Sequence, residues 1–263
     1  MPPIPRIHLN SPGLFVTATD TGVGKTVASC CIINALKNKA PHSRHRAFKP
    51  FASECQMING HLTNLDALAL QQFSDRGTPL DLINPIRFQP PLAPGVAAEQ
   101  ENQSIDWPNL TNAIHELDQQ ADTMIVEGAG GLLVPLDPDH PSFTILDLAM
   151  HIGYPVLIIA RATLGTLNHT TMTVKLLQQR GLSIAGIVMN HHQPQLVTLA
   201  DDPSIHTNKI WLERMTGVPV LAVLPNVPTD SVIPHKKEIH PDVLRACDSI
   251  DWESLMHPAK PLV

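Results

Sequence analysis

Short apolar segments alternate with longer amphipathic segments along most of the chain. Apolar runs rich in β-branched residues predict strands, whereas leucine and alanine at helical spacing predict helices. We expect strands at 13–18, 47–51, 124–131, 155–160, 184–189 and 218–224, and helices at 25–36, 62–73 and 167–180. The runs at 155–160 and 184–189 are typical of central parallel strands. The pattern therefore predicts an α/β fold with an open, mainly parallel sheet and helices on both faces.

Length and composition narrow the class of protein. The chain has 263 residues, of which 43% are hydrophobic, and this suits a single domain over residues 1–263. Its longest apolar run is too short to cross a bilayer and its N-terminal segment lacks the apolar stretch of a signal peptide, so we expect a cytoplasmic protein without a membrane partner. A net charge of -6 with no basic stripe argues against binding to nucleic acid.

Cysteines and histidines give no strong signal of a metal or redox site. The four cysteines form no C-x-x-C pair, so we expect reduced thiols that pack in the core. His191 and His192 are adjacent in a loop rich in proline and glutamine, and no histidine spacing typical of a zinc site occurs.

A phosphate-binding loop is the strongest motif in the chain. Residues 17–26 read Thr-Ala-Thr-Asp-Thr-Gly-Val-Gly-Lys-Thr and lie between the first predicted strand and the first predicted helix, which is the context that a P-loop requires. Gly22 and Gly24 let backbone N–H groups turn toward phosphate, Lys25 reaches the β- and γ-phosphates, and Thr26 can bind Mg²⁺. Thr19 stands where the strict pattern has glycine, so a chance turn that caps an ordinary helix remains the alternative.

Other polar residues lie where predicted strands end, which is the edge at which open parallel sheets bind ligands. Lys49 could hold a phosphoryl group or an anionic substrate, or be an ordinary surface lysine. Glu127 precedes three glycines within 128–131 and is placed where phosphoryl-transfer sites have a second carboxylate close to the magnesium ion. Asn190 could recognise a base edge, or form a plain turn. Asp66 reads first as part of a solvated helix face.

Taken in order, these segments resemble dethiobiotin synthetase, an ATP-dependent enzyme family of biotin synthesis. The matching segments are 17–26, Lys49-Pro-Phe-Ala-Ser53, 64–70, Asn84-Pro85, 91–94, Val126-Glu-Gly-Ala-Gly-Gly131, 164–169, 181–186, Asn190 and Leu224-Pro225. The similarity covers roughly residues 13–228, and residues 229–263 contain nothing diagnostic. The combination of Lys-Pro-x-Ala-Ser with Glu-Gly-Ala-Gly-Gly is the most specific part.

The resemblance implies a P-loop NTPase-type fold, a homodimer and a defined reaction. In this family 7,8-diaminopelargonic acid takes up CO2 to form a carbamate, whose oxygen attacks the γ-phosphate of ATP. The resulting carbamic-phosphoric anhydride closes to the cyclic urea of dethiobiotin, with release of ADP and phosphate. Magnesium is the implied cofactor, and ATP is a co-substrate.

The resemblance also implies roles for individual residues. The catalytic residues would be Lys25, Lys49 and Ser53, and the magnesium ligands Thr26, Asp66 and Glu127. The ATP-binding residues would be Asp20, Thr21, Gly22, Val23, Gly24, Lys25, Thr26, Asn190, Pro225, Asn226 and Val227. The substrate-binding residues would be Lys49, Ser53, Gly128, Ala129, Gly130, Gly131 and, across the dimer, Asn168.

Several positions depart from the family pattern, and two other classes of protein compete. Ala18 and Gly22 differ in the loop, and Phe51 and Glu54 are larger than the residues common around the lysine-serine motif. Nucleotide-switched positioning ATPases share the fold, but their characteristic lysine would fall at Asp20. Amidotransferase-type synthetases need a glutaminase domain, for which 263 residues leave little room.

Overall fold

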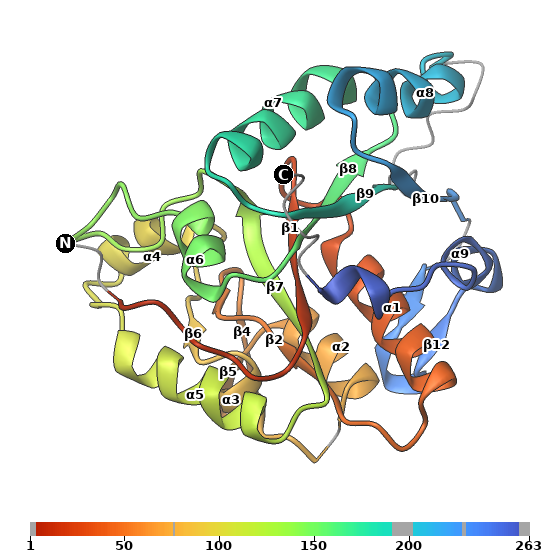
Figure 1. Cartoon of the computed structure of the whole chain (residues 1–263). Helices are drawn as coiled ribbons and strands as arrows, with labels where there is room; N and C mark the ends of the chain where they lie inside the picture. The colour runs from red at the N-terminus through yellow and green to blue at the C-terminus, as the bar shows by residue number, and fades with distance from the viewer. Residues whose placement is uncertain (1–3, 76, 191–201, 228–229, 258–263) are drawn as a thin grey trace.

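The computed structural model describes residues 4–75, 77–190, 202–227 and 230–257. Within them the main sheet has six strands in the order β10-β9-β8-β1-β7-β2, and every neighbouring pair is parallel (Figure 1). Its strands are β1 (Gly13–Ala18), β2 (His45–Phe48), β7 (Thr123–Gly131), β8 (Val156–Arg161), β9 (Ile184–Asn190) and β10 (Val220–Leu224). The predicted parallel α/β sheet is confirmed.

Helices cover both faces of this sheet. Successive apolar side chains of β1 point to opposite faces and pack in two separate cores, one on each side of the sheet. Leu14 and Val16 pack with one set of helices, whereas Phe15 packs with the other. The first set is α1 (Lys25–Lys39), α2 (Leu65–Phe73) and α9 (Pro241–Cys247). The second set is α5 (Trp107–Gln119), α6 (Ile145–Ile152), α7 (Thr166–Gln179) and α8 (Ile205–Thr216). The described part of the chain thus has the expected layers of helix, sheet and helix.

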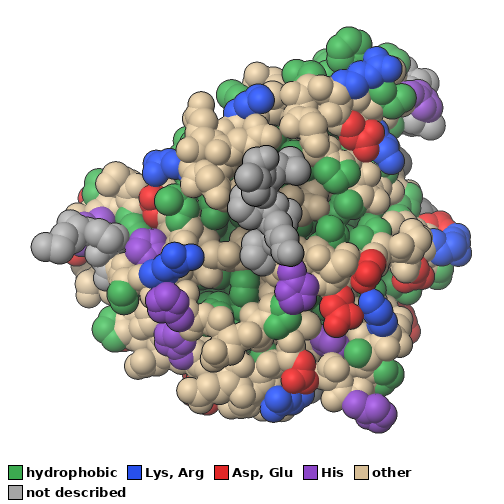
Figure 2. Space-filling view, in the orientation of Figure 1, with side chains coloured by type: hydrophobic (Ala, Val, Ile, Leu, Met, Phe, Trp, Pro, Cys, Tyr) green, Lys and Arg blue, Asp and Glu red, His purple; other side chains and the backbone are tan. Residues whose placement is uncertain are grey.

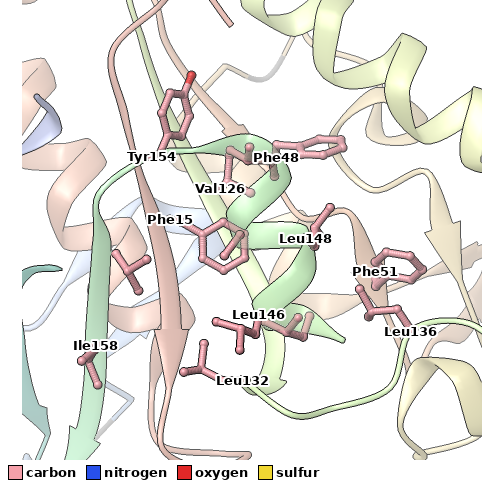
Figure 3. Packing of buried hydrophobic residues seen from close by; sticks show 14 of the residues in the cluster. Phe15, Phe48, Phe51, Val126, Leu132, Leu136, Leu146, Leu148, Tyr154 and Ile158 are labelled. Carbon is pink, nitrogen blue, oxygen red and sulfur yellow. The ribbon is translucent and has the colours of Figure 1, made fainter. Parts of the chain in front are cut away.

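The second core holds the central strands in place. Phe15 of β1, Val126 of β7 and Ile158 of β8 are fully buried, and Leu146 and Leu148 of α6 pack against them (Figure 3). Each such side chain stabilises the fold by about 1.5–3 kcal/mol relative to an exposed one. This packing fixes the strands whose carboxyl ends carry the polar residues predicted above.

Shorter elements lie in the connections between these strands and helices. They are β3 (Phe51–Ala52), β4 (Gln56–Ile58), β5 (His61–Thr63), α3 (Leu80–Ile83), β6 (Ile86–Arg87), α4 (Pro94–Gln100), β11 (Val232–Ile233), η1 (Pro234–Lys236), β12 (Glu238–Ile239) and η2 (Ser254–Met256). The β3–β6 pair is parallel and the β4–β5 pair is an antiparallel hairpin. Both pairs follow Lys49 in the chain, and β3 lines the site described below.

Two predicted elements are wrong in their extent. The strand predicted at 47–51 ends at Phe48, and the chain resumes as β3 after Pro50, which has no N–H to donate to a sheet. The helix predicted at 62–73 begins only at Leu65, because the Asn64 side chain accepts a hydrogen bond from the N–H of Ala67 at 3.1 Å and caps the helix. The residues before Asn64 belong instead to the β4–β5 hairpin.

Among the described residues, no helix combines the length and the apolar character needed to span a membrane. On the face shown in Figure 2, Lys and Arg side chains are scattered among acidic and apolar ones.

Candidate active site at the phosphate loop

The phosphate loop connects the end of β1 at Ala18 to the start of α1 at Lys25. Gly24 caps α1 with φ of 92°, in the left-handed region that favours glycine. A Cβ atom at Gly24 would lie 2.1 Å from Nδ2 of Asn190, so the loop also needs glycine for space. The first turn of α1 has no acidic residue, and its N-terminus is therefore suited to bind an anion.

Lys25 is a buried cation with no counter-charge of its own among the described residues. Its residue is 8% exposed, and within the described part of the chain its side chain has no hydrogen-bond or ion-pair partner. Burial, followed by the charge of Lys49, lowers the pKa of the Lys25 ammonium. A bound anion would compensate both effects.

Glu127 is the centre of a buried polar cluster. Its carboxylate is fully buried, and Oε1 accepts hydrogen bonds from Nζ of Lys49 at 2.7 Å and from the hydroxyl of Thr26 at 2.8 Å. Oε2 accepts a hydrogen bond from the hydroxyl of Ser29 at 2.8 Å. Lys49 follows β2 and Glu127 lies in β7, and because these strands are neighbours their carboxyl ends bring the two charges together.

Asp66 is the second acid at this site. It lies in the first turn of α2, and its Oδ2 is 3.4 Å from Nζ of Lys49. Burial would lower the pKa of Lys49, but the charges of Glu127 and Asp66 outweigh it and raise that pKa. Desolvation would raise the pKa of Asp66, but Lys49 and the Thr26 hydroxyl outweigh it and lower that pKa. Lys49 and Asp66 therefore stay ionised at neutral pH.

A cavity of about 280 Å³ opens beside this cluster. The predicted site residues that line it are Thr21, Gly22, Lys25, Lys49, Ser53, Asp66, Ala129 and Gly130. The rest of its wall is formed by Phe51, Ala52, Glu54, Asn64, Val134 and the segment from Pro91 to Pro94. The structure thus brings the phosphate loop, the lysine-serine motif and part of the glycine segment to one cavity.

Other predicted site residues lie outside the lining of this cavity. Thr26 and Glu127 lie behind it in the polar cluster. Gly128 is buried beside Phe15 and Ile145, and Val23 packs in the core. Gly131 is paired with Ala18 of β1.

The remaining residues surround the loop on other sides. Asp20 is exposed and forms an ion pair with Arg161 at 3.3 Å. Asn190 is buried at the end of β9, where its Nδ2 donates to the carbonyl of Val23 at 2.9 Å. Pro225, Asn226 and Val227 directly follow β10, the strand paired with β9. Asn168 is exposed on α7 and is not among the residues that line the cavity.

Three polar residues of the site were given no role by the sequence reasoning, although Asn64 and Asn84 lie in segments that match the family. Ser29 lies three residues after Thr26 on α1, so helical spacing could have placed both hydroxyls on one face. Asn84 donates to the carbonyl of Lys49 at 2.7 Å, and Asn64 donates to the carbonyl of Ser53 at 3.1 Å. Both fix the backbone of the lysine-serine motif, and only the three-dimensional structure shows these contacts.

The oxygen atoms at the cluster suit magnesium. Thr26, Asp66 and Glu127 offer one hydroxyl and two carboxylates, which are hard oxygen donors of the kind that Mg²⁺ prefers. The described residues contain no group of three or more histidines, cysteines and acids that could hold a metal on its own. Nucleotide phosphates would then complete the coordination, as is usual for Mg²⁺ in phosphoryl-transfer sites. His191 and His192 lie outside the described residues.

Comparison with known proteins identifies the family. A family model described as an AAA domain matches residues 12–231. The chain is 43% identical over 215 residues to the ATP-dependent dethiobiotin synthetase BioD of Anaeromyxobacter dehalogenans (strain 2CP-1 / ATCC BAA-258), which covers 81% of this chain and 89% of that protein. The chain belongs to the dethiobiotin synthetase family. A more distant member, from Escherichia coli O157:H7, is 39% identical over 180 residues and covers 68% of this chain and 78% of that protein.

Solved structures show that this dethiobiotin synthetase family member shares its fold with other P-loop proteins. The MinC:MinD cell division protein complex of Aquifex aeolicus matches with a TM-score of 0.56 at 13% identity, over 96% of this chain and 99% of that one. The septum site-determining protein MinD of Pyrococcus horikoshii OT3, complexed with Mg-ADP, matches with a TM-score of 0.53 at 16% identity, over 91% and 93%. At these identities the likeness concerns the fold alone, whereas the sequence places the chain among the synthetases.

Proposed function

We propose that the protein makes dethiobiotin from 7,8-diaminopelargonic acid, CO2 and ATP. The observation that carries this proposal is the convergence of Lys25, Lys49 and Ser53 on one cavity beside the Glu127 cluster. Phosphoryl transfer between two anions needs cations and alignment more than a covalent partner, and two lysines supply these. Membership of the dethiobiotin synthetase family supports the same reaction.

The proposed reaction proceeds in three steps. One amine of the diamine forms a C–N bond to CO2 and loses a proton, which gives a carbamate. A carbamate oxygen bonds to the γ-phosphorus while the bond from that phosphorus to ADP breaks, which gives the carbamic-phosphoric anhydride. The second amine then attacks the carbamate carbon, loses a proton and displaces phosphate as the cyclic urea closes.

Residues at the cavity divide these tasks. Lys25 binds the β- and γ-phosphates with the backbone N–H groups of residues 20–26, and Lys49 stabilises the carbamate and the phosphoryl group. The Ser53 hydroxyl donates to the carbamate, and Ala129 and Gly130 line the substrate side. Thr26, Asp66 and Glu127 would hold Mg²⁺. When bound, this ion would neutralise part of the negative charge on the phosphates.

Adenine would lie between the ends of β9 and β10, near Asn190 and residues 225–227. The Asn190 amide already donates to Val23, so it supports the loop as well as facing this end of the sheet. The proposal places the enzyme in the cytoplasm, where ATP and CO2 are available.

A homodimer would complete the substrate site. A second cavity of about 370 Å³ lies between the loop residues 18–21, residues 131–134 and α7. Leu133 and Met172 line it and are 67% and 56% exposed, which favours coverage by a second copy of the chain. Asn168 of α7 would then reach the substrate of the partner. Sedimentation of the wild-type protein at the mass of one protomer would contradict this part of the proposal.

One assay tests the function. Purified protein is mixed with ATP, Mg²⁺, bicarbonate and 7,8-diaminopelargonic acid, and phosphate release and dethiobiotin are measured, the latter by mass spectrometry. We expect dethiobiotin only when all components are present. Binding of ATP without diamine-dependent turnover would contradict the proposed reaction while leaving the phosphate loop intact.

A further inference from the structure

Glu54 places a carboxylate at the wall of the active-site cavity. It directly follows Ser53 and lines the cavity together with Lys49 and Ser53. Within the described residues its carboxylate has no hydrogen-bond or ion-pair partner, and only its backbone N–H is bonded, to the carbonyl of Pro90. The side chain is exposed and therefore free to meet a ligand.

The backbone at Glu54 is in a conformation that favours glycine. Its φ is 57°, in the left-handed region, which costs a residue with a Cβ atom roughly 1–2 kcal/mol. The chain fixes this conformation, because Glu54 N donates to Pro90 O at 3.1 Å and Cys55 N donates to Phe88 O at 3.0 Å. A glutamate kept at a strained position beside Ser53 suggests a role for its carboxylate.

The charges around the cavity show which group Glu54 can bind. Glu127 and Asp66 are both paired with Lys49, whereas Lys25 and Lys49 face the part of the cavity where phosphate and carbamate would bind. Of the two acids that line the cavity, Asp66 is paired with Lys49, whereas Glu54 has no cationic partner in the described part of the chain. A cationic group of a ligand would supply one.

We propose that Glu54 binds the free ammonium group of the diamine substrate and so sets specificity for a diamine. This inference rests on the proposed function. The two amines of that substrate are on adjacent carbons, and Ser53 and Glu54 are adjacent residues, so a carbamate held at Ser53 leaves the second nitrogen near Glu54. The ion pair stabilises bound substrate but not the later neutral amine, so it lowers KM rather than raising kcat.

Steady-state kinetics of Glu54→Gln and Glu54→Gly test the proposal. We expect both variants to raise KM for the diamine about five- to tenfold, which is the effect of losing one partly exposed charged contact. KM for ATP should change less than about twofold. Added salt should raise the KM for the diamine less in both variants than in the wild type. Glu54→Gly should also raise the melting temperature, because glycine relieves the strained backbone. The glutamine variant should not raise it.

Controls separate the possible outcomes. Glu116→Gln removes an exposed carboxylate from α5, outside the cavity lining, and should leave every parameter unchanged. An unchanged or lowered diamine KM in both Glu54 variants, alongside wild-type turnover, would overturn the inference and leave the proposed function standing. Absence of diamine-dependent turnover in the wild type would overturn both.

Discussion

Lys25→Met removes the unpaired charge of the phosphate loop while keeping a side chain of similar length. In the described structure the ammonium is buried, lacks a partner and lies near the like charge of Lys49. A buried polar group without a hydrogen-bond partner costs about 1–3 kcal/mol, and the acids nearby offset part of that. We therefore expect the ligand-free variant to be more stable than the wild type by about 1–2 kcal/mol at neutral pH. For a chain of this size, that corresponds to a rise in melting temperature of roughly 2–4 °C.

The pH dependence gives the prediction a second test. The folded-state pKa of Lys25 is lower than its ordinary value of 10.5, so the unfolded chain binds more protons between these two values. Wild-type stability consequently rises with pH through that window. The methionine variant lacks the group, and its stability advantage should be largest at neutral pH and shrink as the pH approaches 10.5.

In the presence of Mg-ATP, the wild type should be more stable than the Lys25→Met variant. ATP at a hundred times its Kd stabilises the wild type by about 2.7 kcal/mol, and the variant should lose most of this gain. Scanning calorimetry at two pH values, with and without Mg-ATP, measures all these quantities, and the exposed Lys209 of α8 provides a matched Lys209→Met control. A ligand-free variant less stable than the wild type at neutral pH, or an advantage that does not change with pH, would refute the reasoning.

Three further predictions concern the remaining charged residues. Lys49→Ala should still bind ATP in a calorimetric titration but form no dethiobiotin. It should also be destabilised by about 3 kcal/mol, because buried Glu127 loses its cation. Turnover at the wild-type rate would remove Lys49 from the mechanism. Asp66→Ala and Glu127→Ala should each raise the Mg²⁺ concentration for half-maximal rate by about tenfold or more, and unchanged metal dependence in both would contradict the ligand assignment. Arg161→Ala should weaken ATP binding about threefold because Asp20 loses its cation at 3.3 Å, and adding Asp20→Asn should restore it; no rescue would show that Arg161 acts otherwise.

Local signals in the sequence were sufficient for the main sheet. The predicted strand at 13–18 has the same bounds as β1, because an apolar run between Pro12 and the polar loop defines both its ends. The hairpin β4–β5 was missed although Asn59 and Gly60, with φ of 52° and 82°, form an Asn-Gly turn of the kind that favours hairpins. Helix α5 was also missed, although the Asp106 cap precedes it and Pro108 lies in its first turn.

The candidate site depended on information that local patterns do not contain. Lys49 and Glu127 were each predicted as site residues because each lies where a predicted strand ends. Their contact, however, requires β2 to lie beside β7, with β7 between β2 and β1. Strand order of this kind is fixed by packing between segments far apart in the sequence. Asn64 and Asn84 lie in segments that match the family, but their hydrogen bonds to the backbone of the lysine-serine motif could not be predicted for the same reason. The proposed role of Asn168 involves a second chain, which no single-chain pattern can place.

The distribution of charge in the cluster explains why the two lysines should differ in function. Lys49 is paired with both Glu127 and Asp66, so moving it toward a phosphoryl group separates it from two carboxylates. Lys25 breaks no such pair when an anion arrives, because the described chain gives it none. Under the proposed roles, binding of the nucleotide phosphates through Lys25 would be the least costly first change, and Lys49 would become available only when another cation neutralises Glu127 and Asp66. On this argument substitution of Lys25 should affect nucleotide affinity most, and substitution of Lys49 should affect the chemical steps.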